Sequence, residues 1–174
     1  MLKDDEIFTQ EEIYNIAKGV ENKRDRALFI IYYLTGGRAS EIVGELRKKD
    51  IKFTNDFMLV KTKTLKNRNV DRRILPIPIS KEKHLVDLFM EWYDIINRDD
   101  VPLFRIGRKR TWQIIRQICG ERTHFLRHTR FTHLVTIYDF NDSQLQKFAG
   151  WSDTRPASIY THLKWEDLGK KMLE

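Results

Sequence analysis

The segment that decides the fold class covers residues 51–75 and has the sequence IKFTNDFMLVKTKTLKNRNVDRRIL. It contains three short runs rich in β-branched, aromatic and aliphatic residues, which is the composition typical of strands. These runs are residues 51–53, 57–61 and 73–75. Asn55 and Asp56 favour a tight first turn, and the basic polar residues 64–69 predict a longer second loop. The segment therefore predicts one small antiparallel sheet.

Helical patterns lie on both sides of this sheet. Thr9 and Glu12 form a capping-box pattern, and apolar residues follow at helical spacing as far as Val20. Further helices are predicted at residues 23–34, 39–46, 80–97, 109–119, 123–138 and 143–149, with a pair around Tyr160 and Leu168. The predicted fold class is α+β, mostly α-helical, with helices around a small three-stranded antiparallel sheet.

The composition narrows the classes of protein. A chain of 174 residues with 41% hydrophobic residues predicts one folded domain. The net charge of +7 fits an anionic partner, nucleic acid or a membrane surface, and fits a soluble basic protein equally well. The single cysteine, Cys119, excludes an internal disulfide and a multi-cysteine metal site. The longest apolar run, residues 27–34, is too short to span a bilayer, so we expect no transmembrane helix. We also expect no membrane among the partners.

The first candidate site residue is Arg38, which follows a Gly-Gly turn at a predicted helix start. Helix N-termini favour anions, so an arginine there is a plausible phosphate clamp that Glu41 would orient. For this segment alone, an ordinary surface ion pair between Arg38 and Glu41 is the commoner explanation.

The second candidate cluster is His124, Arg127 and His128, which a helix would present on one face. Arginine offers paired donors to phosphate oxygens, and histidine can donate a hydrogen bond or move a proton. Two alternatives are a solvated basic helix and a metal pair of the two histidines. The metal interpretation needs a third ligand, and this helix offers none.

The third candidate is Tyr160, which follows Gly150 and Trp151. A tyrosine can act as a covalent nucleophile on phosphorus if neighbouring cations stabilise the transition state. Taken singly, most such tyrosines are packing residues.

Together these clusters resemble the boxes of the tyrosine recombinase (phage integrase) family. Residues 35–41 match the box TGxRxxE, residues 124–134 match HxLRHTxxTHL, and Gly150-Trp151 precedes the tyrosine as in the third box. The family carries a lysine on a β-hairpin, for which Lys63 is the best match; Lys61 and Lys66 are the alternatives. The resemblance covers essentially the whole chain. It implies the tyrosine recombinase catalytic domain fold, with residues 1–174 as a single catalytic domain without the family's N-terminal core-binding domain.

The resemblance also implies a role for each residue. Tyr160 would attack a DNA phosphate to give a 3′-phosphotyrosyl link, while Arg38 and Arg127 neutralise the phosphate and Lys63 protonates the leaving 5′-oxygen. His124 would be a further phosphate donor and acid or base, Trp151 an indole N–H donor, and Glu41 and His128 supporting residues. No cofactor, metal or ATP is implied. Trp151 stands where the family more often has histidine; Arg130 and Phe131 stand where it usually has apolar and small residues.

The implied function is a site-specific DNA recombinase or integrase of a virus, plasmid or chromosome. It would act on double-stranded DNA as a homo-tetramer on two duplexes, and be a monomer or weak oligomer without DNA. Its expected location is the cytoplasm, on the nucleoid, or the host cytoplasm if it is viral. The alternatives are a type IB topoisomerase-like nicking and rejoining enzyme, a catalytically inactive DNA-binding module, and a metal-dependent nuclease that uses the two histidines.

Overall fold

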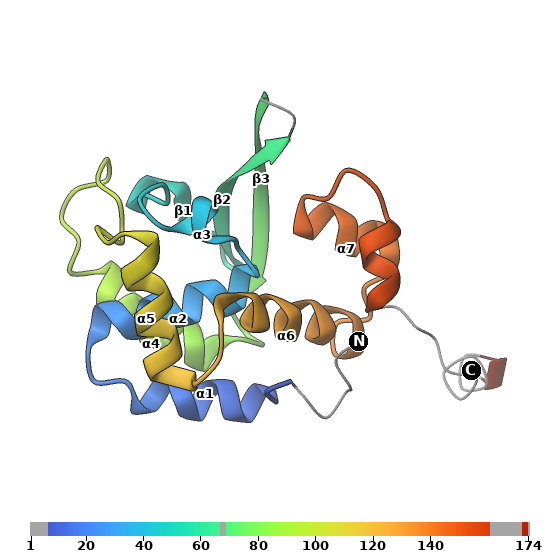
Figure 1. The fold of residues 1–174 in the computed structure, drawn as a ribbon, viewed down its shortest axis with the longest axis horizontal. Helices are drawn as coiled ribbons and strands as arrows, with labels where there is room; N and C mark the ends of the chain where they lie inside the picture. Colours follow the sequence, from blue (N-terminus) through green and yellow to red (C-terminus); the bar gives the residue numbers. More distant parts are fainter. Residues whose placement is uncertain (1–6, 67–68, 161–171, 174) are drawn as a thin grey trace. The chain divides into compact units, whose positions relative to one another are not determined.

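The computed structural model describes residues 7–66, 69–160 and 172–173. Contacts between residues divide the chain into two units, residues 2–130 and residues 131–174. The described residues form the helices and the three-stranded antiparallel sheet shown in Figure 1. The α+β, mostly helical fold class is therefore confirmed.

Helix α2 (Lys23–Thr35) forms the centre of the first unit. It begins where the Asn22 side chain accepts a hydrogen bond from Asp25, and it ends at Gly36 in the left-handed conformation (φ 57°). Every side chain from residue 26 to residue 35 is buried, which requires other elements on all sides of the helix. These elements include α1 (Gln10–Gly19), α4 (Lys83–Tyr93), α5 (Arg108–Cys119) and β3 (Asn69–Pro78).

The sheet has the order β1 (Ile51–Phe53), β2 (Phe57–Lys66) and β3, all antiparallel. The prediction of a loop at residues 64–69 is wrong, because β2 and β3 stay paired as far as Lys66 and Asn69. This stretch lacks an alternating apolar pattern, but the pairing of β2 with β3 is made by backbone hydrogen bonds, which do not require one. The two long strands therefore form an arm, which Figure 1 shows extending away from the helices of this unit.

The base of the hairpin is anchored by side chains on one face of the sheet. Met58 pairs with Ile77 and Val60 with Leu75, and all four side chains are buried. On the opposite face Ile74 is 60% exposed. The buried pairs fix the register of the strands, since a slip of one residue would turn the apolar side chains to solvent. Lys63 follows shortly after this anchored part.

Two helices of the first unit differ in length from the prediction. Helix α3 covers only Ala39–Ile42 instead of residues 39–46, because Val43 is extended and Gly44 has a φ of 74°. Helix α4 covers Lys83–Tyr93 instead of residues 80–97. A 3-10 turn, η2 (Lys48–Asp50), was not predicted. The short α3 leaves Glu45 in an irregular segment that lies close to β2.

Helix α6 (Thr123–Thr136) begins in the first unit, and α7 (Asp142–Ala149) belongs to the second. Asn141 and Gln144 form a capping box at the start of α7, and Gly150 (φ 71°) ends it, as the sequence predicts. A 3-10 helix, η3 (Arg155–Ile159), leads directly to Tyr160. The predicted helix around Leu168 lies outside the described residues. Across the described part of the chain, no helix is long and apolar enough to cross a membrane.

Arg130, for which the sequence offers no physical account, is 1% exposed and forms an ion pair with Glu82 at 2.6 Å. Its guanidinium also lies over the ring of Tyr33, 5.2 Å from the centroid. Burial raises the pKa of the Tyr33 hydroxyl to about 12, so this group is neutral at physiological pH. The buried charge of Arg130 is therefore balanced by Glu82 at the start of α4.

Glu82→Gln is expected to lower the free energy of unfolding by about 3–5 kcal/mol, because it leaves the buried guanidinium without its counter-charge. Urea unfolding followed by circular dichroism measures this change. Asp87→Asn is the matched control, since it removes the exposed pair with Lys83 on the same helix and costs at most about 0.5 kcal/mol. A loss below about 1 kcal/mol for Glu82→Gln would show that groups other than Glu82 balance the buried charge of Arg130.

Candidate active site

The turn after α2 is built so that Arg38 leaves it in a fixed direction. The Gly37 N–H donates to the Thr35 hydroxyl (3.0 Å), and that hydroxyl donates back to the Ile31 carbonyl (2.6 Å). A Cβ atom at Gly37 would lie 2.8 Å from Ile42 Cδ1, closer than real contacts allow. The two glycines therefore allow a tight, sterically crowded turn directly before Arg38.

Glu41 is the buried acid beneath this turn, with a side chain 2% exposed. It accepts a hydrogen bond from the Arg38 backbone N–H at 2.8 Å and caps the first turn of α3. The Arg38 guanidinium lies at 3.8 Å from the same carboxylate and is 46% exposed. Arg38 therefore has the partner that the sequence suggests, while much of its charged head stays accessible.

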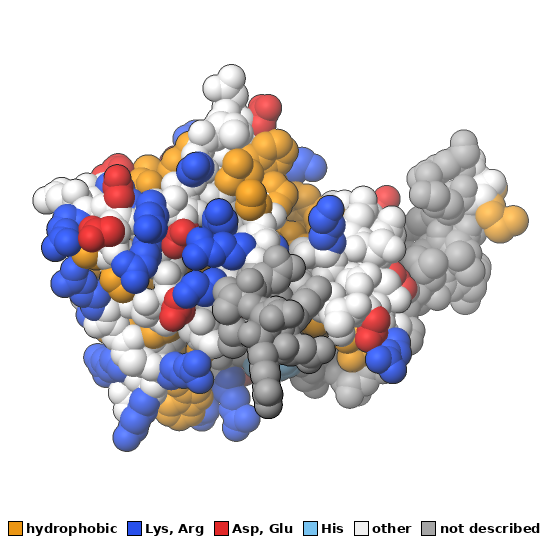
Figure 2. Space-filling view, turned by 90° about the horizontal axis from the view of Figure 1, so that it is seen from above, with side chains coloured by type: hydrophobic (Ala, Val, Ile, Leu, Met, Phe, Trp, Pro, Cys, Tyr) orange, Lys and Arg blue, Asp and Glu red, His pale blue; other side chains and the backbone are white. Residues whose placement is uncertain are grey.

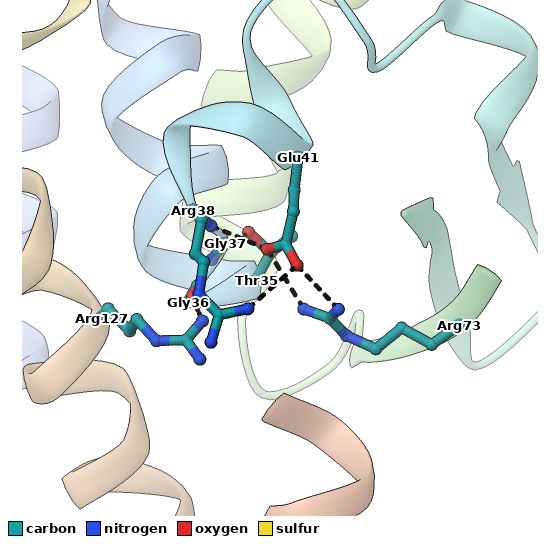
Figure 3. Close-up of polar contacts among 7 residues, drawn as sticks. All are labelled: Thr35, Gly36, Gly37, Arg38, Glu41, Arg73 and Arg127. Carbon is teal, nitrogen blue, oxygen red and sulfur yellow. Dashed lines mark hydrogen bonds and ion pairs between the residues drawn. The ribbon is translucent and has the colours of Figure 1, made fainter. Parts of the chain in front are cut away.

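Arg73 on β3 is a residue of this site that the sequence analysis missed. Its two terminal nitrogens donate to the two oxygens of Glu41, at 2.9 and 3.3 Å (Figure 3). The Arg73 side chain is 11% exposed. The two residues are 32 positions apart in sequence, and no spacing pattern connects a strand arginine with a helix glutamate.

Arg127 reaches the same turn from α6. It is 6% exposed, and its Nη1 donates to the carbonyl of Gly36. Figure 3 shows the Arg38 and Arg127 side chains extending to the same side of the turn. Arg38 and Arg73 thus lie at the Glu41 carboxylate and Arg127 at the Gly36 carbonyl of the same turn, so these four side chains together carry a formal charge of +2. Such a cluster is suited to an anion.

The two histidines of α6 differ in exposure. His124 is exposed at the first turn, and His128, one turn further along, is half-buried. The predicted roles of His124 as a donor to the phosphate and of His128 as a supporting residue stay predictions.

Lys63 on β2 forms an ion pair with Glu45 at 2.5 Å, and both side chains are partly exposed. Lys63 and Glu41 line the same cavity, of about 270 Å³, together with Glu45, Lys61 and Arg72. Lys63 thus shares a cavity with Glu41, the carboxylate that pairs with Arg38 and Arg73. Lys61 is exposed, and the side chain of Lys66 lies outside the described residues.

The predicted nucleophile, Tyr160, and Trp151 lie together in the second unit. Their rings are stacked, with centroids 6.1 Å apart and an interplanar angle of 18°. Phe131 is fully buried and meets both rings edge-on, at 5.2 Å from Trp151 and 5.6 Å from Tyr160. Phe131, which the sequence left unexplained, therefore fills the space beside the tyrosine.

The sequence model of the phage integrase family matches residues 6–166 of the chain. The chain belongs to this family. The tyrosine recombinase XerA of Saccharolobus solfataricus is 31% identical over 169 residues, which cover 94% of this chain and 54% of that protein. XerA of Thermococcus onnurineus is 25% identical over 180 residues, covering 94% of this chain and 60% of the relative. The chain thus spans little more than half the length of these family members.

Two solved structures of recombinases are similar to this member of the family. XerH bound to its difH substrate in a pre-cleavage complex has a TM-score of 0.70 and covers 94% of this chain and 52% of its own. The crystal structure of XerA recombinase has a TM-score of 0.69, and the match covers 96% of this chain and 62% of XerA. Both are 18% identical in sequence, so these likenesses show the fold.

Proposed function

We propose that the chain cleaves and rejoins DNA strands through a covalent bond between Tyr160 and a DNA phosphate, as the catalytic part of a site-specific recombinase. The observation that carries this proposal is the group of arginines at one turn, in a chain of the phage integrase family: Arg38 and Arg73 lie at the Glu41 carboxylate, and Arg127 donates to the Gly36 carbonyl. A phosphodiester under attack gains negative charge, and preorganised cations stabilise that charge.

In the proposed reaction, the Tyr160 oxygen attacks the phosphorus and the bond from phosphorus to the 5′-oxygen breaks. The tyrosine proton passes to His124, and Lys63 gives a proton to the departing 5′-oxygen. Arg38 and Arg127 donate to the non-bridging oxygens, to which Trp151 adds its indole N–H, the only donor that an indole has. The phosphotyrosyl bond keeps the energy of the phosphodiester, so the reverse attack by a 5′-hydroxyl restores the strand without ATP or metal.

The proposed partner is double-stranded DNA. Helix α5 exposes Arg108, Lys109, Trp112 and Arg116, and Arg116 lies 5.5 Å from the ring centroid of Trp112. Figure 2 shows many Lys and Arg side chains over the first unit when it is seen from above the hairpin. The solved relatives XerH and the Tn1549 integrase are complexes with DNA. We propose that the active state is a homo-tetramer on two duplexes. We propose that the protein is located in the cytoplasm, on the nucleoid, where its DNA substrate lies.

DNA affinity is expected to fall steeply with salt. Neutralisation of three phosphates, for which Arg108, Lys109 and Arg116 of α5 are the candidates, gives a loss of roughly 40-fold between 50 and 200 mM salt. Fluorescence anisotropy with a labelled duplex at several salt concentrations measures this slope. A salt-independent affinity would rule out contacts with the phosphate backbone.

The test of the proposed function uses a nicked duplex with a bridging phosphorothiolate at the candidate site, with EDTA present. We expect a protein–DNA adduct that resists SDS. An adduct on this duplex, with no strand exchange between two unmodified duplexes, would favour the topoisomerase-like alternative. Salt-sensitive binding without any adduct would favour a DNA-binding module, and cleavage that EDTA abolishes would favour a nuclease.

A further inference from the structure

Glu41 has more cationic partners than one carboxylate needs. Arg73 occupies both of its oxygens in a forked arrangement, at 2.9 and 3.3 Å, while the Arg38 guanidinium stands at 3.8 Å. With 2% of its side chain exposed, Glu41 depends on protein groups to balance its charge. A buried carboxylate without a close cation is costly, so one of the two arginines must stay with it.

The two arginines differ in what they can do besides pairing with Glu41. Arg73 is 11% exposed and projects from the anchored part of β3, where its strand neighbour across the sheet is the buried Thr62. Arg38 is 46% exposed and lies on the same turn that Arg127 reaches. Arg73 is therefore suited to a permanent ion pair, and Arg38 to an anion that arrives from outside.

We propose that Arg73 is a positioning residue that neutralises Glu41 and so keeps the Arg38 guanidinium available for the DNA phosphate. Without Arg73, the Arg38 guanidinium, already 3.8 Å from the Glu41 carboxylate, is drawn into a closer pair with it. A guanidinium paired in this way has fewer donors for a phosphate oxygen. This inference rests on the proposed function, because its consequence is measured on the cleavage step.

Arg73→Ala is expected to lower the maximal rate of adduct formation by about tenfold or more. The reason is that it weakens Arg38 as a preorganised donor, and complete removal of such a donor typically lowers the rate by about 10²–10³. The DNA concentration for half-maximal rate is expected to stay nearly unchanged, since Arg73 is 11% exposed, is paired with Glu41 and is not one of the proposed DNA contacts. Both quantities come from adduct formation by the full 174-residue chain on the phosphorothiolate duplex.

A second substitution separates charge neutralisation from a structural role. Glu41→Gln keeps an oxygen for the Arg38 N–H but removes the charge that captures Arg38. We therefore expect the double variant Arg73→Ala/Glu41→Gln to recover the rate of Glu41→Gln alone. A structural role predicts instead that the two losses multiply, because each change would damage the fold independently. A double variant slower than Glu41→Gln alone would overturn the proposal.

The controls distinguish failure of this inference from failure of the proposed function. No adduct with the unsubstituted chain overturns the proposed function and this inference with it. An adduct at the unsubstituted rate with Arg73→Ala overturns the inference alone. If circular dichroism shows that Arg73→Ala does not fold, Arg73→Lys takes its place, because lysine keeps the positive charge without the forked pair. The proposal then requires that the maximal rate of adduct formation falls by less than tenfold. Arg98→Ala, which removes an exposed arginine paired with Asp100, controls for net charge.

Discussion

Tyr160→Phe is expected to abolish the SDS-resistant adduct and to leave DNA binding almost unchanged. The substitution removes only the hydroxyl oxygen, which is the atom that would attack the phosphorus. Phenylalanine keeps the ring that stacks on Trp151 and meets Phe131 edge-on, so the local packing is preserved. Adduct formation is measured by gel electrophoresis in SDS and binding by fluorescence anisotropy, on the same duplex.

Tyr138→Phe is the matched control, because Tyr138 is a second half-buried tyrosine of the same unit. We expect it to form the adduct at the normal rate. An adduct with Tyr160→Phe would show that another residue is the nucleophile. Loss of the adduct in both variants would show that the hydroxyls serve the fold of this unit rather than the chemistry.

Most elements of the fold are predictable from local signals in the sequence. The capping box at Thr9 and the glycines at positions 36 and 150 mark helix boundaries because they satisfy backbone groups locally. The length of the hairpin arm is not predictable in this way. Backbone pairing needs no apolar alternation, so the sequence of residues 64–69 predicts a loop although β2 and β3 pair as far as Lys66 and Asn69.

The site is less predictable than the fold, because its contacts join residues far apart in the chain. Spacing along one helix relates His124 to Arg127, and the family boxes relate both to Arg38. The contact of Arg73 with Glu41 and that of Arg127 with the Gly36 carbonyl depend on how strand, turn and helix pack together. Arg130 also requires the packed structure for its explanation, since its partner Glu82 is 48 residues away.

Arg38→Ala is expected to lower the maximal rate of adduct formation by about 10²–10³, as the loss of one preorganised charge donor typically does. The melting temperature is expected to stay nearly constant, because the Arg38 side chain is 46% exposed and Glu41 keeps its forked pair with Arg73. DNA affinity is expected to fall only modestly, since Arg38 is one of several phosphate contacts. Single-turnover kinetics, thermal melting and anisotropy give the three quantities.

Arg127→Ala is expected to lose the adduct to a similar degree, but with a cost in stability that Arg38→Ala does not have. The 6% exposed Arg127 donates to the Gly36 carbonyl, and a hydrogen bond from a charged group contributes about 1.5–3 kcal/mol. Only Arg38→Ala therefore separates phosphate stabilisation from the integrity of the turn. If Arg38→Ala lost DNA binding and cleavage to the same degree while Arg98→Ala lost neither, Arg38 would contribute to DNA binding in the ground state. It would then not stabilise the transition state selectively.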